Sequence, residues 1–163
     1  MEKLDLEKYP HLKRKSFAEN LRRALSAIIH IPVDQTRTIE DKNVFLNEFD
    51  MTVGRLLQLF GTEVGRVIHP DIWVISLFMQ FDASHDFWII DDVRFVNEAD
   101  AIKKHGGILI RLEGDPGNII ESSKRNLNHE SETALDDYHG FDVIIHTNNY
   151  INQLDAMLQL ILQ

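Results

Sequence analysis

The stretch WIIDDVRFVNEADAIKKHGGILIRLEG, residues 88–114, decides the fold class. The apolar residues 87–90 predict a buried strand, and the pattern over 97–105 predicts a helix. The glycine pair 106–107 marks the end of that helix, because glycine is common just after a helix C-terminus. A second apolar run over 108–112 predicts another buried strand. Strand, helix and strand with continuous apolar runs form the pattern of a βαβ unit, which predicts parallel strands covered on both faces.

The remainder of the chain carries helix and strand signals of the same kind. Residues 36–47 are polar and turn-like, and the composition of 114–128, rich in Gly, Pro, Asn and Ser, predicts a mobile loop or lid. The other expected elements are a helix with Leu21, Leu25, Ile28 and Ile29 on one side, a helix capped by Thr52 that carries Val53, Leu56, Leu57, Phe60 and Val64, a helix opened by Pro70, a strand over 141–145 and a closing amphipathic helix over 151–162.

Length and composition predict one domain over residues 1–163, large enough for a hydrophobic core. The chain has no cysteine, which excludes disulfides and thiolate zinc sites. Its net charge of −9 argues against a general nucleic-acid coat, since binding to a phosphate backbone needs clustered positive charge. No apolar run is long enough for a bilayer span, and the N-terminal MEKLDLEKY is too charged for a signal peptide. We therefore expect a cytoplasmic protein that binds neither membrane nor nucleic acid.

Three charged residues stand together at the carboxyl end of the 87–90 strand: Asp91, Asp92 and Arg94. Ligands of open parallel sheets bind at the carboxyl ends of the strands. An acid at such a position holds Mg²⁺ directly or through water, and an arginine clamps phosphoryl oxygens with its planar fork. The alternative is structural: Asp91 caps a turn, while Asp92 and Arg94 form an ion pair. The residues alone leave both readings open.

Other motifs have structural readings of similar weight. Arg66, at the end of GTEVGR (61–66), is placed to reach a phosphate or to complement the dipole of a helix end. Residues 129–132, HESE, resemble a helix start, and the cations of Lys13 to Lys15 favour a solvated surface cluster. The histidines show no HExxH spacing and no GxSxG is present, so neither a zinc site nor a serine hydrolase is supported.

Five segments in series resemble the deoxynucleoside monophosphate kinases of phages and large DNA viruses, within the P-loop kinase superfamily. Animal phosphomevalonate kinases are similar in outline but more distant. The resemblance covers roughly residues 13–163, and the segments are SFAENLRRAL (16–25), RLLQLFGTEVGR (55–66), DIWV (71–74), WIIDDVRFVNEADAI (88–102) and HESETALDDY (129–138).

The resemblance implies an α/β, three-layer P-loop-kinase-like domain with a mostly parallel sheet. It implies transfer of the ATP γ-phosphoryl group to a deoxynucleoside monophosphate, with ATP and Mg²⁺ as cofactors. In that reading Asp92 organises Mg²⁺, and Arg94 and the lid residue Arg125 neutralise charge during transfer. The substrate-binding residues implied in the same way are Arg66 on the acceptor phosphate, Phe17 and Trp73 along the nucleoside pocket, and Gln58.

The chain departs from the pattern of that family in three places. Asp91 stands where the family has serine, and Val96 where it has proline. More seriously, the family opens with a central strand and the loop GxxxxGK[ST], whereas this sequence has no Gly-Lys pair. We therefore expect weak or no ATP-dependent kinase activity, and the alternative function is a catalytically inactive nucleotide-binding or structural subunit. Three explanations stay open: another chain supplies the missing piece, the start of the sequence was cut or misassigned, or the sheet is rebuilt. A sheet without its middle strand exposes costly edges, so we also expect a homo-oligomer or a subunit of a larger complex.

Overall fold

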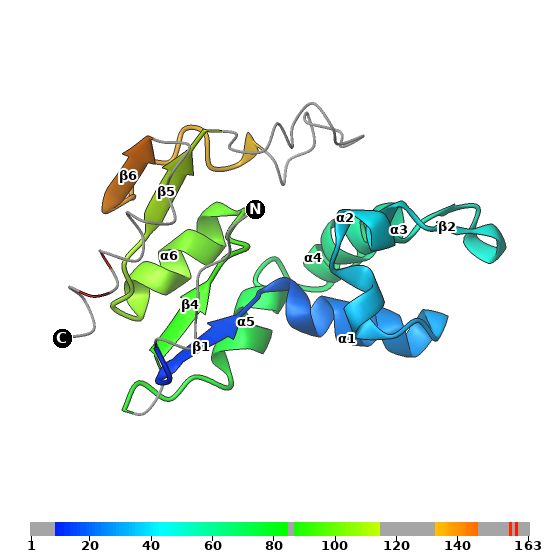
Figure 1. Cartoon of the computed structure of the whole chain (residues 1–163), viewed down its shortest axis with the longest axis horizontal. Helices are drawn as coiled ribbons and strands as arrows, with labels where there is room; N and C mark the ends of the chain where they lie inside the picture. The colour runs from blue at the N-terminus through cyan, green and yellow to red at the C-terminus, as the bar shows by residue number, and fades with distance from the viewer. Residues whose placement is uncertain (1–8, 85–86, 115–132, 147–156, 158, 160–163) are drawn as a thin grey trace. The chain divides into compact units, whose positions relative to one another are not determined.

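The computed structural model describes residues 9–84, 87–114, 133–146, 157 and 159. Helices and short strands are mixed throughout (Figure 1), which confirms the α/β class. The chain divides into two compact units, Lys13–Val93 and Met1–Leu12 with Arg94–Gln163. The expectation of a single domain over 1–163 stays a prediction.

The unit Lys13–Val93 contains a two-stranded sheet in which β1 (Leu12–Lys15) pairs with β4 (Phe87–Ile90). The bounds of β4 are those that the sequence predicted, but the predicted burial is wrong, because Phe87 is 57% exposed and the other three residues are half-buried. Strand β1 was not predicted, because three of its four residues are cations. Its middle residues Lys13 and Arg14 are exposed, so the charges are solvated as expected although their backbone is in a strand.

The core of this unit lies between helices α1 (Ala18–Ile29) and α3 (Val53–Gln58). Leu25, Val53 and Leu57 are buried, which confirms the helical periodicity of both segments. The partly buried side chains packed against them are Leu21, Ile29, Ile31, Leu46, Leu56 and Phe60. The expected apolar faces were too wide in two places, because the side chains of Ile28 and Val64 are 56% and 46% exposed.

The segment expected to be turn-like has local order of its own. After η2 (Val33–Thr36) it forms α2 (Ile39–Asn43), capped where Thr38 Oγ1 accepts a hydrogen bond from Asp41 N (3.1 Å) and the Asp41 carboxylate accepts one from Thr38 N (2.9 Å). This reciprocal capping box satisfies amides that a helix start leaves without intrahelical partners. Strands β2 (Phe45–Leu46) and β3 (Met51–Thr52) follow as an antiparallel hairpin around η3 (Asn47–Phe49).

A long helix follows the hairpin and changes its winding midway. It begins as α3, where Thr52 is the predicted N-cap and accepts a hydrogen bond from Arg55 N (3.2 Å). It continues as the π-helix η4 (Leu59–Gly65) and ends as α4 (Arg66–Ile68). Helix α5 (Ile72–Phe78) begins two residues after Pro70 and buries Trp73 and Leu77.

The unit that includes Arg94–Gln163 contains helix α6 (Val96–Lys104) and the strands β5 (Ile110–Glu113) and β6 (Val143–His146). The two strands are parallel, with Ile110 opposite Val143 and Glu113 opposite His146 (Figure 1). Both strands start two residues later than predicted. Gly106 has a φ of +78°, a conformation that favours glycine, which confirms the predicted helix stop.

The described strands form three two-stranded sheets, so the expected sheet is present only as small pieces within the described residues. The parallel pairing of β5 and β6 agrees with a P-loop-kinase-like α/β fold. The predicted helix start at 129–132 and nearly all of the predicted helix 151–162 lie outside the described residues. Among the helices that are described, none is long and apolar enough to span a bilayer.

Candidate functional site

Asp92 lies just after β4 and holds the start of α1. Its Oδ1 accepts a hydrogen bond from Phe17 N (2.9 Å), and its Oδ2 accepts one from Ser16 Oγ (2.6 Å) and one from Ala18 N (3.0 Å). The residue before α1 is Phe17, which has no capping oxygen, so a carboxylate 74 to 76 positions further along the chain satisfies these amides instead. A negative charge is also favoured at a helix N-terminus.

Asp91, the neighbouring acid, has a different partner. Its carboxylate forms an ion pair with Arg14 of β1, and both side chains are well exposed. The structural alternative considered from the sequence was a turn cap for Asp91 and an ion pair of Asp92 with Arg94. Within the unit Lys13–Val93, Asp91 pairs with Arg14 and Asp92 accepts hydrogen bonds from the residues 16–18. The pairing of Asp92 with Arg94, which belongs to the other unit, stays a prediction.

Asp92 has room for one more contact. A carboxylate offers about four lone-pair sites, and described residues occupy three of those on Asp92, which leaves one on Oδ1 in this part of the chain. Mg²⁺ keeps several waters and is often bound through one carboxylate and substrate phosphates, so Asp92 fits such an ion at a single position. No cluster of three or more acidic or histidine ligands occurs among the described residues. The residues present do not fit the phosphates of ATP in the way that a loop GxxxxGK[ST] does, because the sequence has no Gly-Lys pair.

Arg66 and Gln58 lie on the long helix of the same unit. Arg66 begins α4, and its Nη1 donates a hydrogen bond to Pro70 O (3.0 Å). The Gln58 Oε1 accepts one from Arg55 Nη1 (2.8 Å). These contacts hold the turn towards α5 and the surface of α3; binding of a substrate by either residue stays a prediction.

Phe17 and Trp73 are core residues of this unit, with 3% and 8% of their surfaces exposed. The ring of Phe17 lies 6.2 Å from that of Phe78, and Trp73 Nε1 donates to Gly61 O (2.8 Å). The sequence left open whether these aromatic residues line a pocket or fill the core. Both are buried, and a second role beside a nucleoside stays a prediction.

The other predicted site residues lie elsewhere. Arg125 and the lid-like loop over 114–128 fall outside the described residues, apart from Gly114. Arg94 belongs to the other unit, where its backbone N donates to a carboxylate oxygen of Glu98 (2.8 Å) at the start of α6. The predicted cleft that joins Asp92, Arg94, Arg66 and the loop therefore stays a prediction.

A group of arginines around the start of α1 was not singled out from the sequence. Arg22 Nη1 donates to Ser16 Oγ (3.2 Å), while Arg37 Nη2 and Arg23 Nε donate to the two carboxylate oxygens of Glu19 (2.7 and 3.2 Å). Burial alone would raise the pKa of Glu19, but the hydrogen bonds and charges of Arg37 and Arg23 outweigh it and lower that pKa. The sequence signal was only a polar helix face, because the contact with Arg37 depends on the fold.

The comparisons with known proteins agree with this architecture. The family model described as deoxynucleotide monophosphate kinase matches residues 7–158. A candidate deoxynucleotide monophosphate kinase of Acanthamoeba polyphaga mimivirus is 28% identical over 161 residues, which cover 88% of this chain and 79% of that relative.

An α/β chain with this match is of the nucleotide-kinase class. It belongs to the deoxynucleotide monophosphate kinase family, because the family model spans most of its length. The family resemblance read from the sequence is thereby confirmed.

Proposed function

We propose that this chain binds a deoxynucleoside monophosphate and takes part in transfer of the γ-phosphoryl group of ATP to it. The family match over residues 7–158 carries the proposal, since that range includes every site residue predicted from the sequence. Kinases of this kind use ATP and Mg²⁺ in general, and both are proposed for this protein on that ground.

In the proposed reaction an oxygen of the acceptor monophosphate attacks the γ-phosphorus of ATP. The bond from that phosphorus to the β,γ-bridging oxygen breaks, and the electron pair leaves with ADP. Phosphoryl transfer depends on positioning and charge stabilisation more than on covalent chemistry. Asp92 would orient Mg²⁺, Arg94 and Arg125 would neutralise charge on the transferred group, and Arg66 would hold the acceptor phosphate.

The surroundings of Asp92 support its part in this proposal. Three hydrogen bonds from residues 16–18 fix both carboxylate oxygens, so little conformational freedom would be lost when an ion or its water binds. The lone pair that remains on Oδ1 is enough for a contact of that kind.

The alternative function is that of a catalytically inactive family member, and it concerns the phosphate loop, since the sequence given has no Gly-Lys pair. The backbone amides and lysine of a phosphate loop supply much of the electrostatic stabilisation in P-loop enzymes. Without them, binding of the monophosphate would survive while transfer would not. The protein would then act as a nucleotide-binding or structural subunit.

A coupled assay with ATP, Mg²⁺ and each of the four common deoxynucleoside monophosphates separates the two functions. Turnover of about 1–100 s⁻¹ is usual for kinases and would establish the enzyme. Absence of turnover together with calorimetric binding of a monophosphate would establish the binding function. If neither turnover nor binding occurs with any of the four nucleotides, the proposal is wrong.

The role of Arg66 has its own test. A charge-assisted hydrogen bond contributes about 1.5–3 kcal/mol, so Arg66→Ala should weaken monophosphate binding roughly ten- to a hundredfold. Arg23→Ala is the control, because Arg23 is an exposed arginine of the same unit that is bonded to Glu19 and to none of the predicted site residues in the described part of the chain. Equal affinity of the wild type and Arg66→Ala would assign the phosphate to another residue.

A further inference from the structure

Arg22 of α1 is linked to Asp92 by hydrogen bonds through Ser16, and it has no role in the proposed function described above. We propose that Arg22 binds the phosphate of the deoxynucleoside monophosphate, so that the acceptor lies beside Asp92. This inference rests on the proposed function, and it names the residue at which the acceptor is held.

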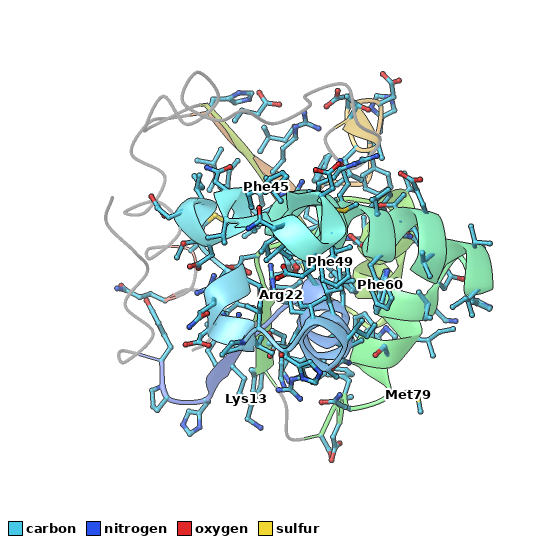
Figure 2. All side chains as sticks on the ribbon, turned by 90° about the vertical axis from the view of Figure 1, so that its right-hand side faces the viewer. Lys13, Arg22, Phe45, Phe49, Phe60 and Met79 are labelled. Carbon is cyan, nitrogen blue, oxygen red and sulfur yellow. The ribbon has the colours of Figure 1, made fainter. Side chains whose placement is uncertain are left out.

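A chain of hydrogen bonds connects Arg22 to Asp92. Arg22 Nη1 donates to Ser16 Oγ (3.2 Å), and the same hydroxyl donates to Asp92 Oδ2 (2.6 Å). One serine therefore links the arginine to the carboxylate proposed to orient Mg²⁺. Figure 2 shows Arg22 near the middle of the view, beside α1, with Lys13 and Met79 at the lower edge.

Arg22 has N–H donors that these hydrogen bonds do not use. Its Nε is buried and has no acceptor among the described residues, and only Nη1 has a hydrogen bond there. A guanidinium carries five N–H donors, and a buried donor without an acceptor is costly and rare in native proteins. Once the side chain turns the edge formed by Nη2 and the buried Nε outward, a tetrahedral anion would supply the missing acceptors in a bidentate geometry.

Arg22 lies among several charged side chains. Burial lowers the pKa of Arg22, the carboxylates of Asp92, Glu19 and Asp91 oppose that shift, and Arg37 adds to it by repulsion. Two of these acids already interact with other arginines, since Glu19 accepts a hydrogen bond from Arg37 and Asp91 forms an ion pair with Arg14. The guanidinium stays charged at neutral pH. A bound anion would compensate it for the hydration lost on burial and would offset its repulsion by Arg37.

The helix terminus itself is not the anion site. The amides of Phe17 and Ala18, which an N-terminus would present to a phosphate, already donate to Asp92. The guanidinium of Arg22 is the group in this network with donors left over, and its planar fork suits phosphate oxygens.

The experiment measures binding of inorganic phosphate, a deoxynucleoside monophosphate and the corresponding deoxynucleoside to the whole chain by calorimetry. Arg22→Gln should weaken binding of both phosphates roughly ten- to a hundredfold. Arg23→Gln is the matched control, since Arg23 is the adjacent residue, is more exposed and is bonded to Glu19; its effect should be less than about threefold. The deoxynucleoside without phosphate should bind both variants equally.

A second measurement covers the case in which Arg22→Gln does not fold. Ser16→Ala keeps the charge of Arg22 and removes its anchor, so phosphate binding should fall while folding persists. In nitrogen-15 spectra of the wild type, phosphate should shift the Nε–H signal of one arginine, and Arg22→Lys should remove that signal.

The outcomes separate this inference from the proposed function. Monophosphate binding that is insensitive to Arg22→Gln, with no shift of the Arg22 signal, overturns the inference and leaves the proposed function standing. Loss of binding in Arg22→Gln, in a wild type that binds but does not turn over, supports the inference and removes the phosphoryl-transfer part of the function. If the wild type binds no phosphate ester, both are wrong.

Discussion

Replacement of Gly65 by alanine tests the packing of the π-helix against α5. A Cβ at this position would lie 2.5 Å from Trp73 Cζ2, 3.0 Å from Trp73 Cε2 and 3.2 Å from Phe60 O. Carbon atoms prefer a separation of about 3.5–4.0 Å, so the indole ring would have to move by roughly 1 Å. That ring is 8% exposed, and its Nε1 donates to Gly61 O (2.8 Å), so it has little room to move.

Two opposing effects set the size of the change. Overpacking of a core costs about 1–3 kcal/mol, whereas alanine in place of glycine within a helix gains about 0.5–1 kcal/mol. We therefore expect Gly65→Ala to lower the free energy of unfolding by about 0.5–2 kcal/mol. The matched control is Gly61→Ala, in the same π-helix, whose Cβ would meet only the terminal methyl groups of Leu21, the nearer at 3.0 Å. A flexible methyl can shift, so this variant should be as stable as the wild type or more stable.

Urea unfolding followed by circular dichroism measures both variants. The midpoint of Gly65→Ala should fall with an unchanged m-value, which indicates a change of stability rather than of the unfolded state. If Gly65→Ala is as stable as Gly61→Ala, the close approach of Trp73 to the glycine backbone does not govern the packing here, and the reasoning fails.

Three further predictions concern charge and association. Asp92→Asn should lower the free energy of unfolding in urea by about 1–3 kcal/mol, because three hydrogen bonds lose their ionised acceptor. The control Asp91→Asn removes an exposed ion pair and should change it by less than about 1 kcal/mol. Equal losses in the two variants would contradict the capping role of Asp92. Because the pKa of Glu19 is lowered on folding, its stabilisation is complete above the unfolded pKa of about 4.3 and is lost as pH falls through the folded pKa. Glu19→Gln should therefore flatten the stability profile below pH ~5, and parallel profiles would refute this. Exposed apolar side chains such as Val67 (79%) and Met79 (82%) favour association of the protein. Sedimentation at micromolar concentration should therefore show species larger than the 18.9 kDa monomer. A single monomeric species would contradict this prediction.

The parts of the fold that the sequence predicted well are those with a local signal. The strand Phe87–Ile90 and the N-cap Thr52 were identified because apolar runs and capping residues act over a few positions. Strand β1 had no such signal, since its residues are mostly cations and it exists by pairing with β4. Val64 was assigned to a buried face by a period of 3.6 residues, which does not apply within a π-helix.

The site was predictable in its residue types but not in its contacts. The acids at the end of β4 were predicted as site residues because ligands bind at the carboxyl ends of parallel strands. The family resemblance supplied their proposed roles. The bonds between Asp92 and the residues 16–18 join positions more than 70 apart, which no local pattern encodes. The position of Arg22 beside the same serine depends on that long-range contact, so it became visible only in the folded chain.

The π-helix Leu59–Gly65 has a consequence for how relatives are aligned with this chain. A π-helix closes each hydrogen bond over one residue more than an α-helix does, so a relative that lacks one residue here keeps an unbroken helix. The extra residue is taken up within the wider turn, so such a relative would keep Arg66 on the same side of the helix, whereas loss of one residue from a purely α-helical stretch would rotate the residues after it by about 100°. A one-residue gap within Leu59–Gly65 would therefore preserve which of the following residues face α5, whereas the same gap placed in the neighbouring α-helical turns would change it.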